Sequence, residues 1–130
     1  MMIRISFKQL IPALAFLAVS GAPVFALAAS NAANGQKVFA EECSECHSAK
    51  AGKNKKGPSL FGVAGLAAAR TPDFEYSDGM RKSGLVWTAD KLDAYIKAPK
   101  SVVPGGKMKY DGLESADARS DVIAYLMTLK

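Results

Sequence analysis

The chain has 130 residues, of which 49% are hydrophobic and 22% are charged, and its formal net charge is +5. These values fit one compact globular domain once the N-terminal segment is considered separately. No dense run of lysine and arginine accompanies the modest positive charge, so the sequence gives no support for nucleic-acid binding.

The first 28 residues have the features of a signal peptide. Arg4 and Lys8 form a short basic start, and residues 10–27 then carry no charged side chain. The segment ends in Ala26-Leu27-Ala28, a pattern of small residues that signal peptidase accepts. We therefore expect cleavage after Ala28, export to the periplasm, and a mature domain over residues 29–130.

An uncleaved membrane anchor is the alternative for this segment, because its uncharged part is nearly long enough to span a bilayer. Pro12, Pro23 and the cleavage pattern favour removal instead. Loss of Arg4 and Lys8 would lower the net charge from +5 to +3.

Three main helices are predicted in the mature chain, and together they indicate an all-α fold. Asn34 is expected to cap the first, which presents residues from Gly35 to Cys46 at intervals of three and four. Thr88 caps the second, which must end before Pro99 and has Leu92, Tyr95 and Ile96 on one side.

Ser115 is expected to begin the last helix. Its apolar stripe is suited to packing on the first helix and comprises Ala118, Val122, Tyr125, Leu126 and Leu129. Residues 48–65, 70–84 and 101–112 are predicted to be loops, since they are rich in glycine and polar residues. Loops this long in a small domain suggest that something inside holds them together.

The sequence Cys43-Ser44-Glu45-Cys46-His47 has the C-x-x-C-H pattern of covalent haem attachment. Two thiols one helical turn apart can reach neighbouring vinyl groups of the porphyrin, and the next residue then places an imidazole beneath the iron. Export would favour a disulfide, but a bridge across this spacing closes only a tiny loop and gains little by chain entropy. We therefore expect one haem c, attached through Cys43 and Cys46, with His47 on the iron.

Two other uses of these residues are weaker. A structural zinc site needs four ligands, and the only candidates are Cys43, Cys46 and His47, two of which are adjacent. A thioredoxin-like redox pair belongs to a βαβ pattern, and no such pattern is visible.

A methionine in the sixth iron position would raise the reduction potential and favour electron transfer. Met127 lies near the stripe of the last helix and is expected to be a packing residue, while Met80 has no obvious frame. Met108 follows Pro104-Gly105-Gly106, which combines a rigid proline with glycines that allow close approach to a flat cofactor. Met108 is therefore the predicted ligand.

The mature chain resembles class I cytochrome c, particularly the bacterial cytochrome c2 group related to mitochondrial cytochrome c. The resemblance covers essentially the whole mature chain, in order and spacing, and is carried by residues 34–47, 57–60, 74–87, 88–99 and 104–130. It implies the cytochrome c fold, in which helices and long loops surround one haem.

The resemblance also implies roles for individual residues. The Pro58 carbonyl would orient the axial imidazole, Tyr76 and Trp87 would bind a haem propionate, and Tyr95 would lie beside the methionine sulfur. Gly35, Phe39 and Tyr125 match residues where the first and last helices meet. Three positions depart from the family pattern and weaken its polar network: Leu66 for an arginine, Met80 for an asparagine and Gly106 for a threonine.

The implied function is a mobile, monomeric one-electron carrier rather than an enzyme. Expected partners are a cytochrome bc1 type donor, a terminal oxidase or reaction centre, and dehydrogenases or reductases. Lysines at 50, 53, 55, 56, 97, 100, 107 and 109 could flank an exposed haem edge and steer it to acidic surfaces, although Glu41, Glu42 and Glu45 interrupt them. A peroxidase or gas sensor with a labile sixth ligand, and a subunit bound to one dehydrogenase or oxidase, are the alternatives.

Overall fold

The protein is described by a computed structural model over residues 29–130. The predicted signal peptide and its cleavage site at Ala28 lie outside the described residues. In residues 29–130, no helix is long and apolar enough to cross a membrane.

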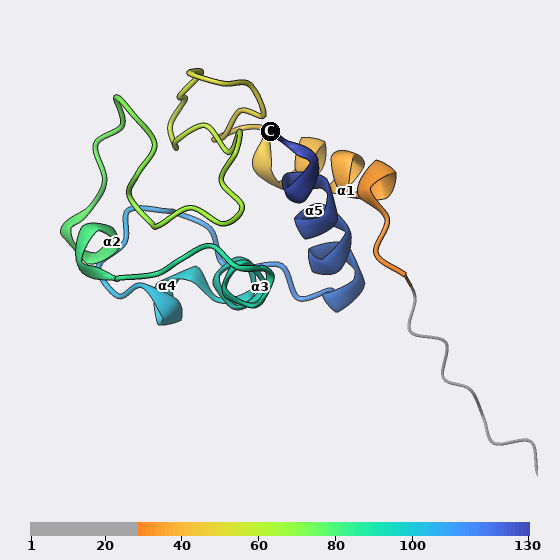
Figure 1. The fold of residues 1–130 in the computed structure, drawn as a ribbon. Helices are drawn as coiled ribbons and strands as arrows, with labels where there is room; N and C mark the ends of the chain where they lie inside the picture. The colour runs from red at the N-terminus through yellow and green to blue at the C-terminus, as the bar shows by residue number, and fades with distance from the viewer. Residues whose placement is uncertain (1–28) are drawn as a thin grey trace, which may run out of the picture.

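The described part of the chain is helical, with long irregular connections (Figure 1). Its elements, in chain order, are α1 (Ala32–Val38), the π-helical turn η1 (Phe39–Cys43), α2 (Asp78–Lys82), α3 (Ala89–Lys97), α4 (Pro99–Val102) and α5 (Ala116–Thr128). Between residues 29 and 130 the only β-type pairing is an isolated antiparallel bridge between Ala67 and Val86. The predicted all-α class is confirmed.

The first helix begins earlier than predicted. Asn31, rather than Asn34, is its N-cap, and the Asn31 side chain accepts hydrogen bonds from the backbone N–H groups of Ala33 and Asn34. Asn34 instead lies inside the helix and donates from its side chain to Asp121 on α5, at 2.6 Å. Both residues are good caps, and the contact with α5 decides between them.

The other predicted caps are confirmed, and two short helices are additional. Thr88 and Ser115 accept hydrogen bonds at the starts of α3 and α5, and α3 ends at Lys97, before Pro99. The predicted loop 70–84 contains α2, capped by Ser77, and α4 takes the first residues of the predicted loop 101–112. Single turns of this kind lack the length for a clear apolar period.

Helices α1 and α5 lie side by side and cross at very close range (Figure 1). Gly35 is the reason, because a Cβ atom there would overlap the carbonyl of Asp121 and approach the Cβ of Tyr125 to 2.9 Å. One turn later, the rings of Phe39 and Tyr125 pack with their centroids 5.5 Å apart. The predicted contact between the first and last helices is thereby confirmed in atomic detail.

Asp121 fastens this crossing from the α5 side. Its carboxylate accepts the backbone N–H of Asn31 at 2.7 Å as well as the Asn34 side chain. These two hydrogen bonds, that from Asn34 first, lower the pKa of Asp121. The carboxylate is therefore charged at neutral pH and holds the start of α1.

The core gathers around α5 and α3. Val122 of α5 is fully enclosed, and the other buried apolar side chains are Phe39, Val63, Met80, Trp87, Leu92, Tyr95, Val103, Ile123 and Leu126. Arg119 is also buried, with 6% of its surface exposed; its Nε donates to Asp93 at 2.8 Å and its Nη1 to the carbonyls of Leu113 and Glu114. A buried guanidinium needs such partners, and they tie α5 to α3.

Gly35→Ala should destabilise the haem-loaded protein. Overpacking costs about 1–3 kcal/mol and the gain in helix propensity is about 1 kcal/mol, so we expect a net loss of up to about 2 kcal/mol. Urea unfolding measures it. The matched variant Gln36→Ala, at an exposed position of the same helix, should change stability by less than about 0.5 kcal/mol. Equal stability of both variants would contradict the close crossing.

Candidate functional site

One cavity, enclosed by η1, α3, α5 and the connecting segments, brings the predicted site residues together. It is lined by Cys43, Cys46, His47, Pro58, Tyr76, Trp87, Tyr95 and Met108. These side chains come from parts of the chain as far apart as η1 and the segment after α4. Most of the remaining wall is apolar, including Leu60, Val63, Leu92, Ile96 and Leu126.

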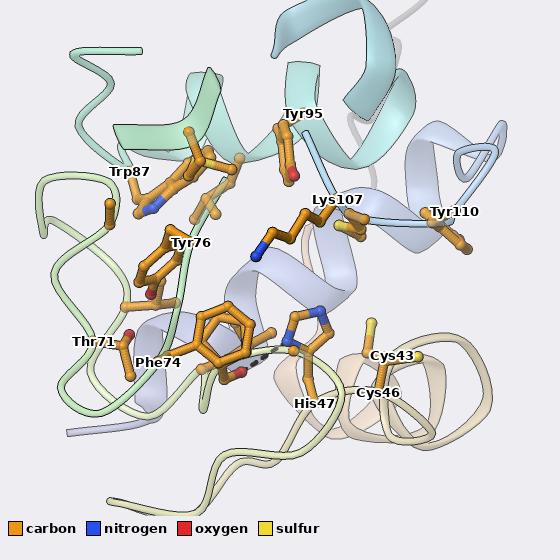
Figure 2. A pocket seen from close by; sticks show the side chains of 18 of the residues that line it. Cys43, Cys46, His47, Thr71, Phe74, Tyr76, Trp87, Tyr95, Lys107 and Tyr110 are labelled. Carbon is orange, nitrogen blue, oxygen red and sulfur yellow. Dashed lines mark hydrogen bonds between the residues drawn. The ribbon is translucent and has the colours of Figure 1, made fainter. Parts of the chain in front are cut away.

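The imidazole of His47 is held by its Nδ1 atom, which donates to the carbonyl oxygen of Pro58 at 2.8 Å (Figure 2). A carbonyl oxygen can only accept, so Nδ1 carries the proton and Nε2 presents its lone pair. Burial, opposed by this hydrogen bond, lowers the pKa of His47. Gly57 makes room for the ring, because a Cβ atom there would overlap three of its atoms.

Cys43 and Cys46 both carry free thiols in the structure and lie beside His47 (Figure 2). The chain turns tightly between them, with the N–H groups of Cys46 and His47 both bonded to the Cys43 carbonyl, at 3.1 and 2.9 Å. Burial, with a smaller contribution from the charge of Glu42, raises the pKa of Cys43 to about 11. Both cysteines therefore line the cavity on the side where His47 lies.

Aromatic side chains form other parts of the cavity wall (Figure 2). Trp87 and Tyr95 pack with centroids 5.0 Å apart, and Tyr76 meets Phe74 edge-on at 4.9 Å. Within residues 29–130, the indole N–H of Trp87 and the hydroxyls of Tyr76 and Tyr95 have no hydrogen-bond partner, yet none of them is sealed off. Burial raises the pKa of Tyr95, so its hydroxyl is kept as a donor.

Two methionines reach the cavity. Met108 is half-buried in its wall, and Met80 lies on α2, where its backbone N–H bonds to the Ser77 side chain at 3.1 Å. Met80 is only 9% exposed, so the surrounding core holds its side chain in place, which the sequence alone did not indicate. The prediction that Met127 is a packing residue is wrong, because its side chain is 45% exposed on α5.

Tyr110 and Glu42 are site residues that sequence reasoning missed. Both line the cavity, and the Tyr110 hydroxyl donates to the Glu42 carboxylate at 2.8 Å. Burial, followed by this hydrogen bond, raises the pKa of Tyr110. An aromatic residue shortly after Met108 was a visible signal for Tyr110, but no sequence pattern joins it to Glu42, 68 residues away.

The residues fit a covalently attached haem. Two free thiols and an oriented imidazole lie at one edge of the cavity, and apolar side chains make most of its wall. Tyr76, Trp87 and Tyr95, whose donors have no partner within residues 29–130, also line it. A flat apolar ring with two charged propionates has the matching chemistry, since it needs apolar contact over its faces and hydrogen-bond donors at one edge.

Comparison with known proteins gives the same result. Residues 32–130 match the family model of cytochrome c. Cytochrome c2 of Rhodopila globiformis is 47% identical over 96 residues, covering 74% of this chain and 91% of the relative; cytochrome c2 iso-2 of Magnetospirillum molischianum is 49% identical over 88 residues, covering 68% and 91%. The solved structure of cytochrome cH from Methylobacterium extorquens superposes with a TM-score of 0.71 at 40% identity and covers 76% of this chain and 99% of that one.

Fold, site and relatives thus define a haem protein of the all-α class, and the chain belongs to the cytochrome c family. Its cofactor is haem c, bound covalently, and Cys43 and Cys46 are the two cysteines of the attachment motif. The function shared by the family follows: this is a monohaem electron carrier.

Gly57→Ala should disturb the site where residue 57 packs against the His47 ring. The added methyl group must push the His47 imidazole away from the Pro58 carbonyl, so we expect a loss of about 1–3 kcal/mol in stability and a changed low-spin Soret spectrum. Urea unfolding and absorption spectra of the haem-loaded protein test this. Lys56→Ala, the exposed neighbour, is the control and should leave the spectrum unchanged.

Proposed function

We propose that this protein is a mobile carrier of single electrons whose haem iron is bound by His47 on one face and Met108 on the other. The haem itself supplies the change of oxidation state. The protein's residues attach the ring, orient the axial imidazole, exclude water and close the second face.

The hydrogen bond from His47 to Pro58 is the observation that carries the proposal. It fixes both the tautomer and the direction of the ring, so that Nε2 is the atom available to iron. A lowered pKa keeps this nitrogen free of a proton at neutral pH. His47 is also the only histidine in the chain, which leaves no second imidazole to compete.

Met108 is supported as the second ligand by its place in a segment that lines the cavity without a helix of its own. Lys107, Met108, Lys109 and Tyr110 line the cavity from an irregular segment, whereas Met80, which also lines it, is fixed within α2 among buried core residues. A thioether from an irregular segment can adjust to the iron, while Met80 packs against the wall. We therefore assign Met80 to packing and Met108 to the metal.

Closed coordination supports a carrier rather than an enzyme. If His47 and Met108 both bind the iron, no coordination position would remain for oxygen or peroxide, and the haem would be limited to gaining and losing one electron. Tyr76 and Trp87 are proposed to bind a propionate, because both line the cavity and their donors have no acceptor within residues 29–130.

We further propose a periplasmic location and acidic redox partners, such as a cytochrome bc1 type donor and a terminal oxidase, reaction centre or reductase. Exposed lysines support this proposal, among them Lys53, Lys55 and Lys109. Lys56 is paired with Glu45 at 2.6 Å and Lys100 with Asp111 at 2.7 Å, so these two contribute less to the positive field. Removal of residues 1–28 on export would release a free monomer.

Met108→Ala should abolish the weak methionine-to-iron band at the red end of the oxidised spectrum and lower the reduction potential. Met80→Ala is the matched control: the band should remain, while stability falls by about 2–5 kcal/mol because a buried side chain is lost. Absorption spectra and redox titration distinguish the two. A band that survives Met108→Ala would remove Met108 as the ligand.

Reduction of the protein by an acidic redox partner should slow about tenfold or more between low and high salt, because lysine steering is screened. Stopped-flow measurement over a salt series gives the slope. Lys53→Gln and Lys109→Gln should each reduce it, whereas an uncharged small reductant should show no salt dependence. Partner rates that are indifferent to salt would exclude steering by the lysines.

A further inference from the structure

Residues 103–115, between α4 and α5, form the segment that carries Met108, and few hydrogen bonds hold it in place. Backbone hydrogen bonds hold its two ends, from Gly106 to Val103 at 3.1 Å and from Leu113 to Ile96 at 3.0 Å. Between these points, its described hydrogen bonds all come from side chains: those of Lys107, Tyr110 and Asp111. These contacts therefore decide how firmly the segment covers the cavity.

Two of these contacts flank Met108 and run to different walls of the cavity. The Nζ atom of Lys107 donates to the carbonyl of Glu75 at 3.2 Å, on the segment before α2. On the other side, the Tyr110 hydroxyl donates to Glu42 of η1 at 2.8 Å. Within residues 29–130, this second contact is the only hydrogen bond between the Met108 segment and the cysteine-bearing turn.

We propose that the Glu42–Tyr110 hydrogen bond is a latch that holds the Met108 segment closed over the haem, and that both residues are positioning residues. The inference rests on the proposed function, because it takes Met108 as the iron ligand. It adds that the rate at which other ligands can displace Met108 is set by this pair.

Geometry favours this contact over the other ties of the segment. Glu42 directly precedes Cys43, so the latch joins the Met108 segment to the point where haem is covalently attached. Tyr110 is half-buried and its rigid ring lines the cavity, which limits the freedom lost on closing. A hydroxyl that donates to a carboxylate also makes one of the stronger kinds of hydrogen bond.

The Lys100–Asp111 ion pair provides a contrast within the same segment. Its side chains are 68% and 97% exposed, and Lys100 belongs to α4, which immediately precedes the segment. Such a pair is screened by solvent and ties the segment only to its own neighbour. It should not resist opening over the haem.

The test is the rate at which imidazole, at a pH where it is uncharged, binds to the oxidised haem-loaded protein. Stopped-flow absorption in the Soret region follows it. We expect Tyr110→Phe and Glu42→Ala each to raise the rate about tenfold or more, the factor expected from one hydrogen bond to a charged carboxylate. The double variant should be no faster than either single variant, because both remove the same contact.

Two further variants sharpen the result. Glu42→Gln keeps an acceptor and should give an intermediate rate, and Asp111→Asn should stay within about twofold of the unchanged protein. Unchanged rates for Tyr110→Phe, effects that multiply in the double variant, or an equal acceleration by Asp111→Asn would each overturn the latch.

The spectrum of the unchanged protein separates this inference from the one on which it rests. If the methionine-to-iron band is absent, Met108 is not the ligand, and the proposal that Glu42 and Tyr110 form a latch is also wrong. If the band is present while the variant rates stay unchanged, the latch alone is wrong and Met108 keeps its role.

Discussion

Backbone contact between α1 and α5 at Gly35 is the constraint on which the placement of the site depends. Helix α1 has only seven residues, too few to be stable by itself, and it gains its order from α5. The turn η1 follows without a break and carries Cys43, so the angle of the crossing also sets the direction of the attachment motif. Asp121 fixes the start of the same unit by two hydrogen bonds. The part of the protein that holds the haem is thus an extension of its helix packing.

The opposite side of the cavity is built differently. Much of its wall comes from connecting segments in which isolated hydrogen bonds and aromatic contacts replace regular structure. Examples are the packing of Phe74 on Tyr76 and of Trp87 on Tyr95 of α3. A segment of this kind gains little stability from its own backbone, and a covalent apolar ring gives it a surface to pack on. The haem is in this sense part of the core as well as the redox centre, and its attachment joins the rigid and the irregular parts of the fold.

Local signals in the sequence located much of this architecture. Thr88, Ser115 and Pro99 mark helix ends by chemistry that acts within a few residues, and they lie where they were expected. Asn31 and Asn34 are equally good N-cap residues, and only the contact of Asn34 with α5 decides which of them caps α1. The prediction of Asn34 from the sequence was therefore wrong. Met127 was misassigned because its place on the surface depends on how the neighbouring stripe is turned.

The site divides in the same manner. A short motif identifies Cys43, Cys46 and His47, and the resemblance to a family supplies Pro58, whose hydrogen bond the structure contains. The contact between Glu42 and Tyr110 joins residues 68 positions apart, and no local sequence pattern predicts such a pairing. Only the three-dimensional structure reveals it.

Because both ends of the Met108 segment are anchored, the residues between them can be substituted without altering the rest of the fold. Val103 is 2% exposed, and beyond the segment Leu113 is bonded to Ile96 and held through its carbonyl by Arg119. The residues between these two anchors contribute little to the packed core. An exchange of these residues with the corresponding stretch of a relative would therefore change the cavity wall around Met108 while the structure on either side keeps its shape.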